Sequence, residues 1–479
     1  MDFSKAELLA ILHEFNPWWT RQPIPELPPW ERKAVKKVCA WARDKTIARM
    51  LLLSGARQTG KTTIFRQSIA HLLKDGIEPT DIIYVTFDHP VLRLAGIERT
   101  LDAWREAYPG AEGRQRFLFL DEIQFLKNWE TWVKHQVDFR RQYRLAATGS
   151  ATSLKDGSIE SGLGRIETLP LPTMTFREYL QLKEISEPSL PDVRNLSEIH
   201  AWGEGQLAEV RRHVEPLTAH FHEYLIRGGF PEPAIQPDIS RTQRLLREDI
   251  VDKALKRDMT AYYGVRRVLE LEKLFLYLCL HDGGMADLPT IASNLENTNR
   301  QTVSNYLDLL EGTHLIYRLK PYGYGKEVLR GRDKIYLSDA AIPGAVTLLG
   351  RKLLENPRKL ASAVETAFFK HVYTRYYGAA PAFRYWTGKK GYEVDVVADF
   401  SDRVVPFEVK YQDTALMESD LVGLRQFCEA HNPEFAYVIT QRWTEFGRMA
   451  LSSAKRGSKE PLAAKVVRVP APLACLLLS

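Results

Sequence analysis

Two short stretches of this 479-residue sequence carry residues whose types and spacing could do chemistry. In LLLSGARQTGKTT, glycines at 55 and 60 precede Lys61 and Thr62, a spacing typical of a loop that binds phosphate and Mg²⁺. In PFEVKYQ, Glu408 and Lys410 are two residues apart, which puts them on one face of a short strand. This second pair is either a strand-edge ion pair or half of a metal-dependent nuclease site.

The surroundings of the glycine-rich stretch fit a nucleotide-binding loop. An apolar strand is expected over 50–53 and an amphipathic helix over 63–73, so backbone N–H groups at the start of the helix can contact phosphate oxygens. No guanine-recognition motif of the NKxD type occurs, which favours ATP. The predicted nucleotide-binding residues are Gly55, Arg57, Gln58, Thr59, Gly60, Lys61, Thr62 and Thr63.

An acidic pair follows another apolar strand, in RFLFLDEIQ. Asp121 would hold Mg²⁺ together with Thr62, and Glu122 would act as general base on the attacking water. The alternative is an acidic cap of the next helix. The strand YRLAATGS brings Thr148 or Ser150 towards the γ-phosphate, the place of a sensor residue. Strands that alternate with helices predict an α/β domain with a parallel sheet and its ligand at the carboxyl ends of the strands.

Composition limits the class of protein. The length predicts about three domains, and 44% hydrophobic with 26% charged residues is ordinary for a globular protein. A net charge of +6 permits a nucleic-acid partner without requiring one. Four scattered cysteines argue against zinc and disulfides, and no apolar run reaches the length of a membrane span. We expect a cytoplasmic protein without a membrane partner.

Several motifs together resemble a known family. LSGARQTGKTT, LFLDEIQFLKNWETWVKHQVD, LAATGSATSL and GRIETLPLPTMTFREYL resemble the archaeal and bacterial AAA-type ATPases of the AAA_14 plus DUF4143 kind, over nearly the whole chain. The resemblance implies that Arg165 acts on the γ-phosphate as a trans-acting or switch arginine; the alternative is an ordinary loop arginine. A trans-acting arginine comes from a neighbouring copy, so a homo-oligomer is expected.

The middle of the chain looks like a winged helix-turn-helix domain. Helices are expected over 288–295 and 299–311, with THLIYRLKPY as the first wing strand. In such a domain the second of these helices enters a DNA major groove. The wing, 318–334, carries six basic and two acidic residues. The predicted DNA-binding residues are Arg300, Asn305, Arg330 and Arg332, although winged helices also dock proteins.

The partners of Glu408 and Lys410 are found upstream. Glu365 lies on a mostly apolar face of a helix expected over 357–374, and Asp395 lies on a strand that precedes the strand of Glu408. Helix Glu, strand Asp and strand Glu-x-Lys resemble the PD-(D/E)xK nuclease fold. The resemblance implies that Asp395 and Glu408 bind Mg²⁺ or Mn²⁺, Glu365 orients a metal-bound water and Lys410 stabilises charge on the phosphate. The alternative is a relic fold that keeps these residues for structure.

The sequence thus predicts three domains: an AAA-type P-loop ATPase with N-terminal helices (1–215), a helical and winged-helix domain (216–350) and a nuclease-like α/β domain (351–479). The leading hypothesis is an ATP-hydrolysing DNA-processing enzyme with a metal-dependent endonuclease, whose DNA substrate is branched, single-stranded or duplex. The alternative is a regulatory or defence-type ATPase switch whose C-terminal domains bind protein and do not cleave DNA.

Overall fold

The computed structural model divides the chain into two compact units. It describes residues 3–479 except 26, 45, 47, 112, 150–163, 192–195, 260–264, 266, 296–297, 324–327, 329–330, 380 and 454–459. The first unit contains Met1–Pro172, and the second contains nearly all of Thr173–Ser479.

The first unit is built on a five-stranded parallel sheet. Its strands lie in the order β2-β3-β4-β1-β5, and every pairing between them is parallel. The strands are β1 (Met50–Ser54), β2 (Ile82–Thr86), β3 (Arg116–Asp121), β4 (Tyr143–Gly149) and β5 (Ile166–Pro170). The expected α/β architecture with a parallel P-loop sheet is therefore confirmed for this part of the chain.

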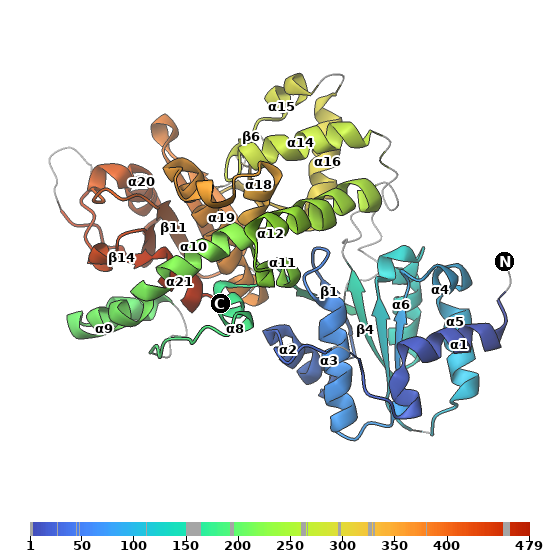
Figure 1. Cartoon of the computed structure of the whole chain (residues 1–479). Coiled ribbons are helices and arrows are strands. Elements are labelled where there is room, and N and C mark those ends of the chain that lie inside the picture. Colours follow the sequence, from blue (N-terminus) through green and yellow to red (C-terminus); the bar gives the residue numbers. More distant parts are fainter. Residues whose placement is uncertain are drawn as a thin grey trace. The chain divides into compact units, whose positions relative to one another are not determined.

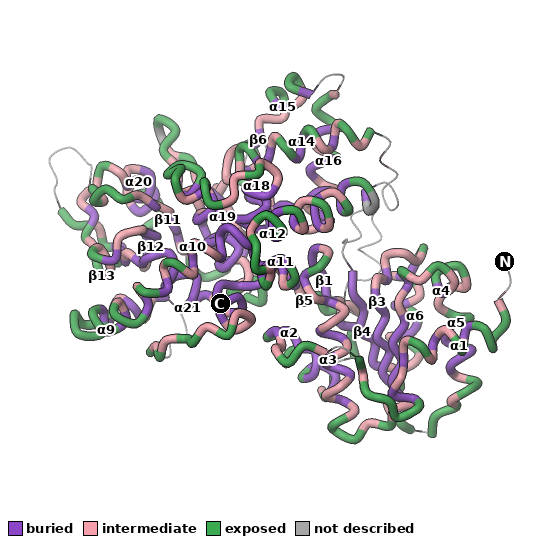
Figure 2. The backbone as a smooth tube through the Cα atoms, in the orientation of Figure 1, coloured by how far each residue is buried: buried purple, intermediate pink, exposed green. Residues whose placement is uncertain are grey.

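Helices cover both faces of this sheet. They are α1 (Lys5–Phe15), α2 (Lys33–Arg43), α3 (Lys61–Lys74), α4 (Pro90–Ala95), α5 (Ile97–Ala107) and α6 (Trp129–Phe139). Figure 1 shows α3 on one side of the strands and α5 and α6 on the other. Every residue of β3 is buried, which agrees with the apolar run FLFL between Arg116 and Asp121, and Figure 2 shows the central strands as buried.

The second unit begins with helices and a helix–hairpin array. Its first helices are α8 (Phe176–Leu182), α9 (Glu204–Val214), α10 (Thr218–Arg227), α11 (Pro231–Ile235) and α12 (Ile239–Leu245), which continues as a π-helix (Leu246–Asp258). There follow α14 (Val268–Leu280), β6 (Met285–Ala286), α15 (Leu288–Asn294), α16 (Arg300–Gly312), β7 (Ile316–Pro321) and β8 (Asp333–Leu337). The expected helices over 288–295 and 299–311 thus correspond to α15 and α16.

The rest of the unit is helix, strands and helices. After α18 (Ala341–Val346) and α19 (Pro357–Tyr376) come β9 (Ala382–Thr387), β10 (Glu393–Asp399), β11 (Val404–Lys410), α20 (Val422–His431), β12 (Phe435–Thr440), β13 (Gly447–Met449), β14 (Lys465–Pro470) and α21 (Ala471–Leu477). Helix α19 begins at a proline, and the Asn356 side chain accepts a hydrogen bond from the Lys359 N–H at 3.1 Å. Strands β9, β10 and β11 form an antiparallel meander, and β12 pairs parallel with β11.

The division of the chain differs from the expected one at 215 and 350. The first unit ends at Pro172, and segments 216–350 and 351–479 lie in one unit because β7 pairs parallel with β9. That pairing joins nine strands into one sheet of order β13-β14-β12-β11-β10-β9-β7-β8-β6. Backbone hydrogen bonds therefore cross the expected boundary at 350, so β7, β8 and the meander form one structure.

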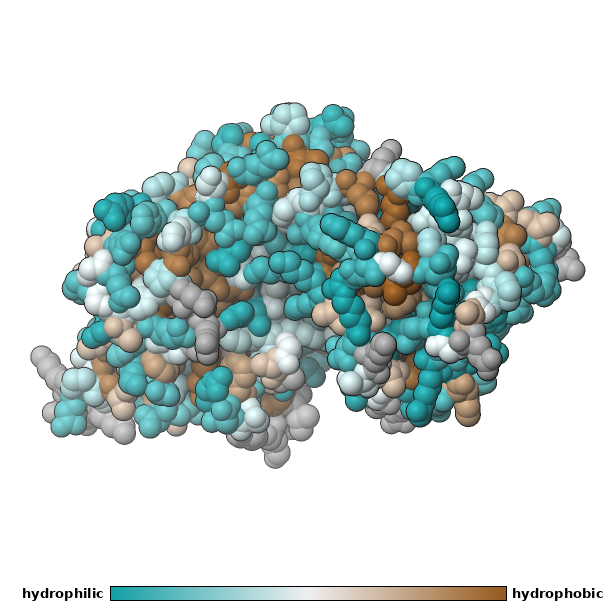
Figure 3. All heavy atoms as spheres, turned by 90° about the horizontal axis from the view of Figure 1, so that it is seen from below, coloured by the Kyte–Doolittle hydropathy of each residue, from teal (hydrophilic) through white to brown (hydrophobic). Residues whose placement is uncertain are grey.

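The surface is mixed in polarity. Hydrophilic residues cover much of the face shown in Figure 3, with apolar areas between them. None of the described helices is both long and apolar enough to cross a membrane.

Candidate nucleotide-binding and metal sites

The loop between β1 and α3 forms a compact cradle at the helix N-terminus. Lys61 is buried, and its Nζ donates to the carbonyl oxygens of Gly55 at 2.9 Å and Ala56 at 2.8 Å. Its ammonium therefore lies against the loop backbone. The Thr59 hydroxyl bonds Ala56 O at 2.9 Å, and the Arg32 guanidinium bonds Thr59 O at 2.9 Å. Arg32 has no motif of its own, and the sequence analysis missed it.

Two glycines of the loop are required by its geometry. A Cβ at Gly55 would lie 2.2 Å from the carbonyl oxygen of Leu171, a backbone atom that cannot move aside freely. Gly60 has φ 93°, the left-handed conformation that favours glycine, directly before α3 begins. The remaining predicted residues line the same turn: Arg57 and Thr63 are half-buried and Gln58 is exposed.

The acidic pair meets the P-loop helix across the sheet. Because β4 lies between β1 and β3, Thr148 at the end of β4 contacts Asp121 at the end of β3. Asp121 Oδ2 also accepts hydrogen bonds from the Thr62 hydroxyl at 2.8 Å and the Tyr84 hydroxyl at 2.7 Å. The structure thus brings Thr62, Asp121 and Thr148 together, and their roles on Mg²⁺ and the γ-phosphate stay predictions. Tyr84, on β2, has no sequence signal beyond its place in an apolar strand.

Glu122 has an unusual backbone conformation. Its φ of 55° places a non-glycine residue in the left-handed region, at a cost of about 1–3 kcal/mol. Its N–H donates to the Thr148 hydroxyl at 2.9 Å, and its carboxylate accepts a hydrogen bond from Gln124. These bonds fix the direction in which the side chain leaves β3.

Arg165 has a partner within its own chain. Its Nε lies 2.7 Å from Asp138 Oδ1 on α6, and the two side chains are 33% and 30% exposed. This hydrogen bond holds the pKa of Asp138 below its ordinary value. The ion pair is what an ordinary loop arginine forms, so a role on the γ-phosphate stays a prediction.

The C-terminal acids gather on one face of the second unit's sheet. Val396 pairs with Phe407, so one further step along the register puts Asp395 opposite Glu408. Asp395 Oδ2 accepts a hydrogen bond from the Val409 N–H at 2.8 Å. Glu408 is buried; its Oε1 lies 2.6 Å from Lys410 Nζ, whereas its Oε2 is buried and has no hydrogen-bond partner in the described part of the chain.

Burial and mutual repulsion separate the acids electrostatically. Burial, together with the charge of Asp395, raises the pKa of Glu408 to about 8 and that of Glu365 to about 6. Burial also acts on Asp395, but the nearby lysines outweigh it and hold the Asp395 pKa below its ordinary value. The cluster therefore combines one carboxyl group with a lowered pKa, Asp395, and two with raised pKa values, Glu365 and Glu408.

The most buried cation of the cluster is Lys334, which the sequence analysis placed only in a basic wing. Its Nζ lies 2.8 Å from both Glu365 Oε1 and Asp395 Oδ1, and its side chain is 3% exposed. Tyr336, two residues on, donates to Glu365 Oε1 at 2.6 Å. Alternation puts both on one strand face, but both faces of β8 are buried, so the sequence could not indicate which one meets α19.

The donor set of this cluster fits a hard divalent cation. Two carboxylates, one with an unpaired buried oxygen, supply the oxygen ligands that Mg²⁺ and Mn²⁺ prefer, and Mg²⁺ often takes only one or two carboxylates plus water. Among the described residues, no group of three or more His, Cys, Asp or Glu side chains has the arrangement of a metal site. A cation here would therefore complete its shell with water or phosphate.

Of the four predicted DNA-binding residues, the three that the structure describes are exposed, while several basic residues of segment 318–334 have acidic partners. Arg300 and Asn305 are exposed on α16, with Asn305 accepting a hydrogen bond from Gln301 at 2.9 Å. Arg332 lies 3.1 Å from Asp287, and Arg330 lies outside the described residues. Within 318–334, Arg318 pairs with acids of α16 and Lys334 is buried, so these two basic residues add little to the exposed positive charge of the segment.

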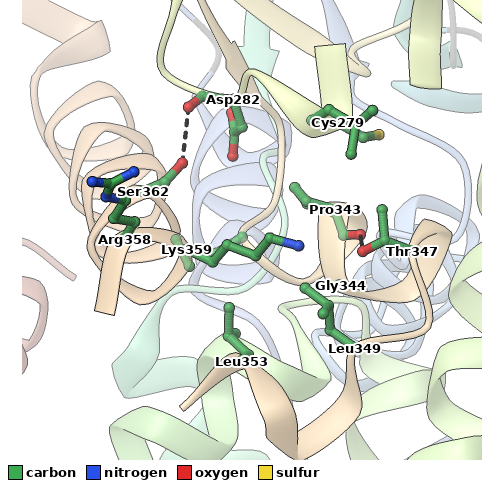
Figure 4. A pocket seen from close by; sticks show the side chains of 13 residues that line it. Cys279, Asp282, Pro343, Gly344, Thr347, Leu349, Leu353, Arg358, Lys359 and Ser362 are labelled. Carbon is green, nitrogen blue, oxygen red and sulfur yellow. Dashed lines mark hydrogen bonds between the residues drawn. The ribbon is translucent and has the colours of Figure 1, made fainter. Parts of the chain in front are cut away.

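A separate pocket of about 210 Å³ lies beside α14, α18 and the start of α19. Figure 4 shows Lys359 reaching across it and Ser362 bonded to the Asp282 carbonyl oxygen, a contact of 2.8 Å. Asp282 is a half-buried acid whose pKa is raised to about 7 by desolvation, although hydrogen bonds from the Leu337 N–H and the Thr366 hydroxyl lower it. None of the predicted site residues that the structure describes lines this pocket.

Family models match three parts of the chain. A model described as an AAA domain matches residues 48–180. Two models described as domains of unknown function, DUF8612 and DUF4143, match residues 218–353 and 361–454. The AAA and DUF4143 matches support the AAA-type ATPase family that the motifs indicated.

The relatives that match more than half of the chain are distant in sequence. An uncharacterized protein of Haemophilus influenzae is 24% identical over 369 residues, covering 75% of this chain and 82% of the relative. An uncharacterized protein of Methanocaldococcus jannaschii is 27% identical over 296 residues, 60% of each chain.

Solved structures align only loosely. The Walker-type ATPase of Pyrococcus abyssi aligns over 67% of this chain and 99% of its own, with 13% identity and a TM-score of 0.38. The Aeropyrum pernix ORC1 protein in complex with DNA aligns over 69% and 96%, with 15% identity and a TM-score of 0.27. These TM-scores support no conclusion about function. The P-loop, the parallel sheet and the AAA-domain match nevertheless agree, and together they support an ATPase of the AAA and P-loop type.

Proposed function

We propose that this protein is an ATP-hydrolysing DNA-processing enzyme that couples an AAA-type ATPase to DNA binding and metal-dependent endonuclease cleavage. The observation that carries the proposal is the cluster of Glu365, Asp395, Glu408 and Lys410 on α19 and adjacent strands. Its order, a helix, an antiparallel three-strand meander, a helix and a parallel strand, supports the PD-(D/E)xK resemblance.

On the ATPase side, the chain's own residues divide the work. The P-loop N–H groups and Lys61 would bind the phosphates, and Thr62 with Asp121 would hold Mg²⁺, the ion that neutralises charge on the phosphates. Glu122 would take a proton from the attacking water. Its left-handed backbone supports this role, because strained residues cluster at functional sites.

On the nuclease side, Asp395 and the unpaired Glu408 Oε2 would hold Mg²⁺ or Mn²⁺, an ion that supplies Lewis-acid activation of phosphate and water. Glu365 would orient the attacking water. Lys410 is the more exposed lysine of the cluster, 29% against 3% for Lys334, so it is the one that can reach a phosphate. Arg300, Asn305, Arg330 and Arg332 would bind DNA on the winged-helix side, and the active form would be a homo-oligomer.

The test is cleavage of labelled linear, nicked and four-way-junction DNA, with Mg²⁺ or Mn²⁺, with and without ATP. We expect the wild type to cut at least one substrate. Asp395→Asn and Glu408→Gln should reduce the rate at least about 10²-fold, because they remove charge from the ion's ligands, while ATPase activity is kept. Asp399→Asn, on the same strand outside the cluster, is the matched control.

One observation favours the alternative, a regulatory or defence-type ATPase switch whose C-terminal domains bind protein. Arg318, Arg332 and Lys334 all have acidic partners, so the wing offers a DNA backbone less charge than its composition implies. A wild type that cuts none of the substrates with either ion, or an Asp395→Asn variant that cuts equally well, would contradict cleavage and leave this alternative.

A further inference from the structure

Lys334 contacts two acids, Glu365 and Asp395, to which the predicted nuclease mechanism gives different roles. Its Nζ lies 2.8 Å from Glu365 Oε1 on α19 and 2.8 Å from Asp395 Oδ1 on β10, and 4.0 Å from Glu393 Oε2. The strand that carries it, β8, pairs with β7, and β7 pairs with β9. Lys334 thus lies on the β7–β8 hairpin, and the pairing of this hairpin with β9 places the lysine beside the acids.

The oxygens around Lys334 already have donors, in contrast to those of Glu408. Glu365 Oε1 accepts from the Tyr336 hydroxyl at 2.6 Å as well as contacting Lys334. Asp395 has Lys334 at one oxygen and the Val409 N–H at the other. Glu408 Oε2 is the carboxylate oxygen of this cluster that is buried without a hydrogen-bond partner among the described residues.

This distribution bears on how many divalent ions the cluster can take. Two-metal sites hold ions about 3.5–4 Å apart, bridged and flanked by carboxylates. A second ion between Asp395 and Glu365 would have to take the place of the Lys334 ammonium, which lies 2.8 Å from an oxygen of each carboxylate. An ion beside Asp395 and Glu408 would have Glu408 Oε2, which has no donor among the described residues, as one ligand, and at Asp395 it would share an oxygen that already accepts from Lys334 or from the Val409 N–H.

We propose that Lys334 is the internal second cation of this site, so that the cluster binds one divalent ion per chain, at Asp395 and Glu408, while Lys334 positions Asp395 and Glu365. The inference rests on the metal site of the proposed function. It assigns the two lysines different roles: Lys410 faces the substrate, and Lys334 takes the place of a metal ion.

The experiment is calorimetric titration of the full-length, nucleotide-free protein with Mn²⁺. The number of ions bound by the wild type minus the number bound by Glu408→Gln gives the number bound at the cluster. Ions at the ATPase site cancel in this difference, because both proteins contain that site. We expect Glu408→Gln to bind one ion per chain fewer than the wild type, and Lys334→Met to bind one ion per chain more than the wild type. Lys334→Arg keeps the charge and should keep the wild-type number, and Lys320→Met, an exposed lysine on the neighbouring strand β7, should change nothing.

The outcomes distinguish a failure of the proposed metal site from a failure of the role proposed for Lys334. If Glu408→Gln binds as many ions as the wild type, the metal site of the proposed function fails. If Glu408→Gln loses an ion but folded Lys334→Met binds the wild-type number with the wild-type affinity, Lys334 excludes nothing and this inference fails alone.

A spectroscopic measurement on the wild type covers the case in which Lys334→Met does not fold. Two Mn²⁺ ions sharing a carboxylate give a spin-coupled electron paramagnetic resonance spectrum, whereas one ion gives an uncoupled six-line spectrum. We expect the uncoupled spectrum at saturating Mn²⁺. A coupled spectrum that disappears on Glu408→Gln would overturn the inference.

Discussion

At the scale of single residues, each site has one group whose environment marks it. Glu122 carries backbone strain at the end of β3, and Glu408 carries a buried oxygen without a partner. Strain and unpaired polar atoms cost free energy in the resting protein. Substitution of Glu122 or Glu408 should therefore reduce activity while the protein still folds.

For the ATPase site, Glu122→Gln should bind nucleotide normally and hydrolyse it at least about 10²-fold more slowly, because the amide cannot accept a proton from water. Lys61→Ala should lose nucleotide affinity instead. Titration with a fluorescent ATP analogue and a phosphate-release assay measure the two effects. Glu130→Gln, on α6, is the control, and normal turnover by Glu122→Gln would remove that residue from the mechanism.

Asp282 gives a prediction about pH. Because its folded-state pKa is raised from 3.8 to about 7, the folded protein binds a proton more tightly than the unfolded chain. The stability this contributes is fully present below the unfolded pKa and is lost as pH rises through about 7. Wild-type Tm should therefore fall relative to that of Asp282→Asn as pH rises from 5 to about 8.

The asparagine variant can keep both hydrogen bonds of Asp282, one accepted from Leu337 N–H at 2.8 Å and one with the Thr366 hydroxyl at 2.7 Å. Asp402→Asn, at an exposed acid, is the control and should follow the wild type at every pH. A Tm difference between wild type and Asp282→Asn that does not vary with pH would show that Asp282 does not titrate in this range.

At the scale of elements, α16 and the β7–β8 hairpin decide whether the second unit can bind DNA. Arg300 and Asn305 are exposed on α16. In the hairpin, by contrast, Arg318 forms ion pairs with Asp308 and Glu311 of α16. The ion pairs fix the hairpin against α16. A DNA contact is therefore expected at the start of the helix and at Arg332, whose side chain is 59% exposed despite its pair with Asp287.

Arg300→Ala with Arg332→Ala should weaken DNA binding and lower the salt slope of log K by up to about 2, near one unit for each lost phosphate contact. Fluorescence anisotropy at several salt concentrations measures both quantities. Arg244→Ala, an exposed arginine on α12, is the control. Unchanged affinity and slope in the double variant would mean that this surface faces a protein or nothing.

At the scale of the whole molecule, the two units have separate cores and separate sheets. A ligand stabilises only the folded unit that binds it. In calorimetry, Mg²⁺ with a non-hydrolysable ATP analogue should raise one unfolding transition and leave another in place, and Lys61→Ala should abolish the rise. A single transition that moves as a whole would show that the units unfold together.

Lys370→Met identifies the transition of the second unit. Lys370 and Asp339 form an ion pair at 3.2 Å in which each side chain is 1% exposed, so removing the lysine leaves a buried charge and should cost about 3–5 kcal/mol. That transition should fall while the nucleotide-dependent one stays. Lys352→Met, at an exposed lysine of the same unit, is the control.

The sequence by itself determined the parts whose chemistry is local in the chain. The P-loop requires glycines, a lysine and a threonine within eight residues, and strand alternation alone puts Glu408 and Lys410 on one face. The order of strands and helices also predicted the parallel sheet of the first unit and the helices at 288–295, 299–311 and 357–374, which the structure has with small shifts at their ends.

Only the tertiary structure decided which strands are neighbours, and with them the partners that lie far apart in the chain. Pairing of β7 with β9 merges two expected domains and brings Lys334 to Glu365 and Asp395, so a lysine counted as a surface charge becomes the buried centre of an acidic cluster. Tyr84 reaches Asp121 in the same way. Such contacts depend on strand order, sheet face and burial, which are set by packing of the whole unit and leave no periodic signal in the residues themselves.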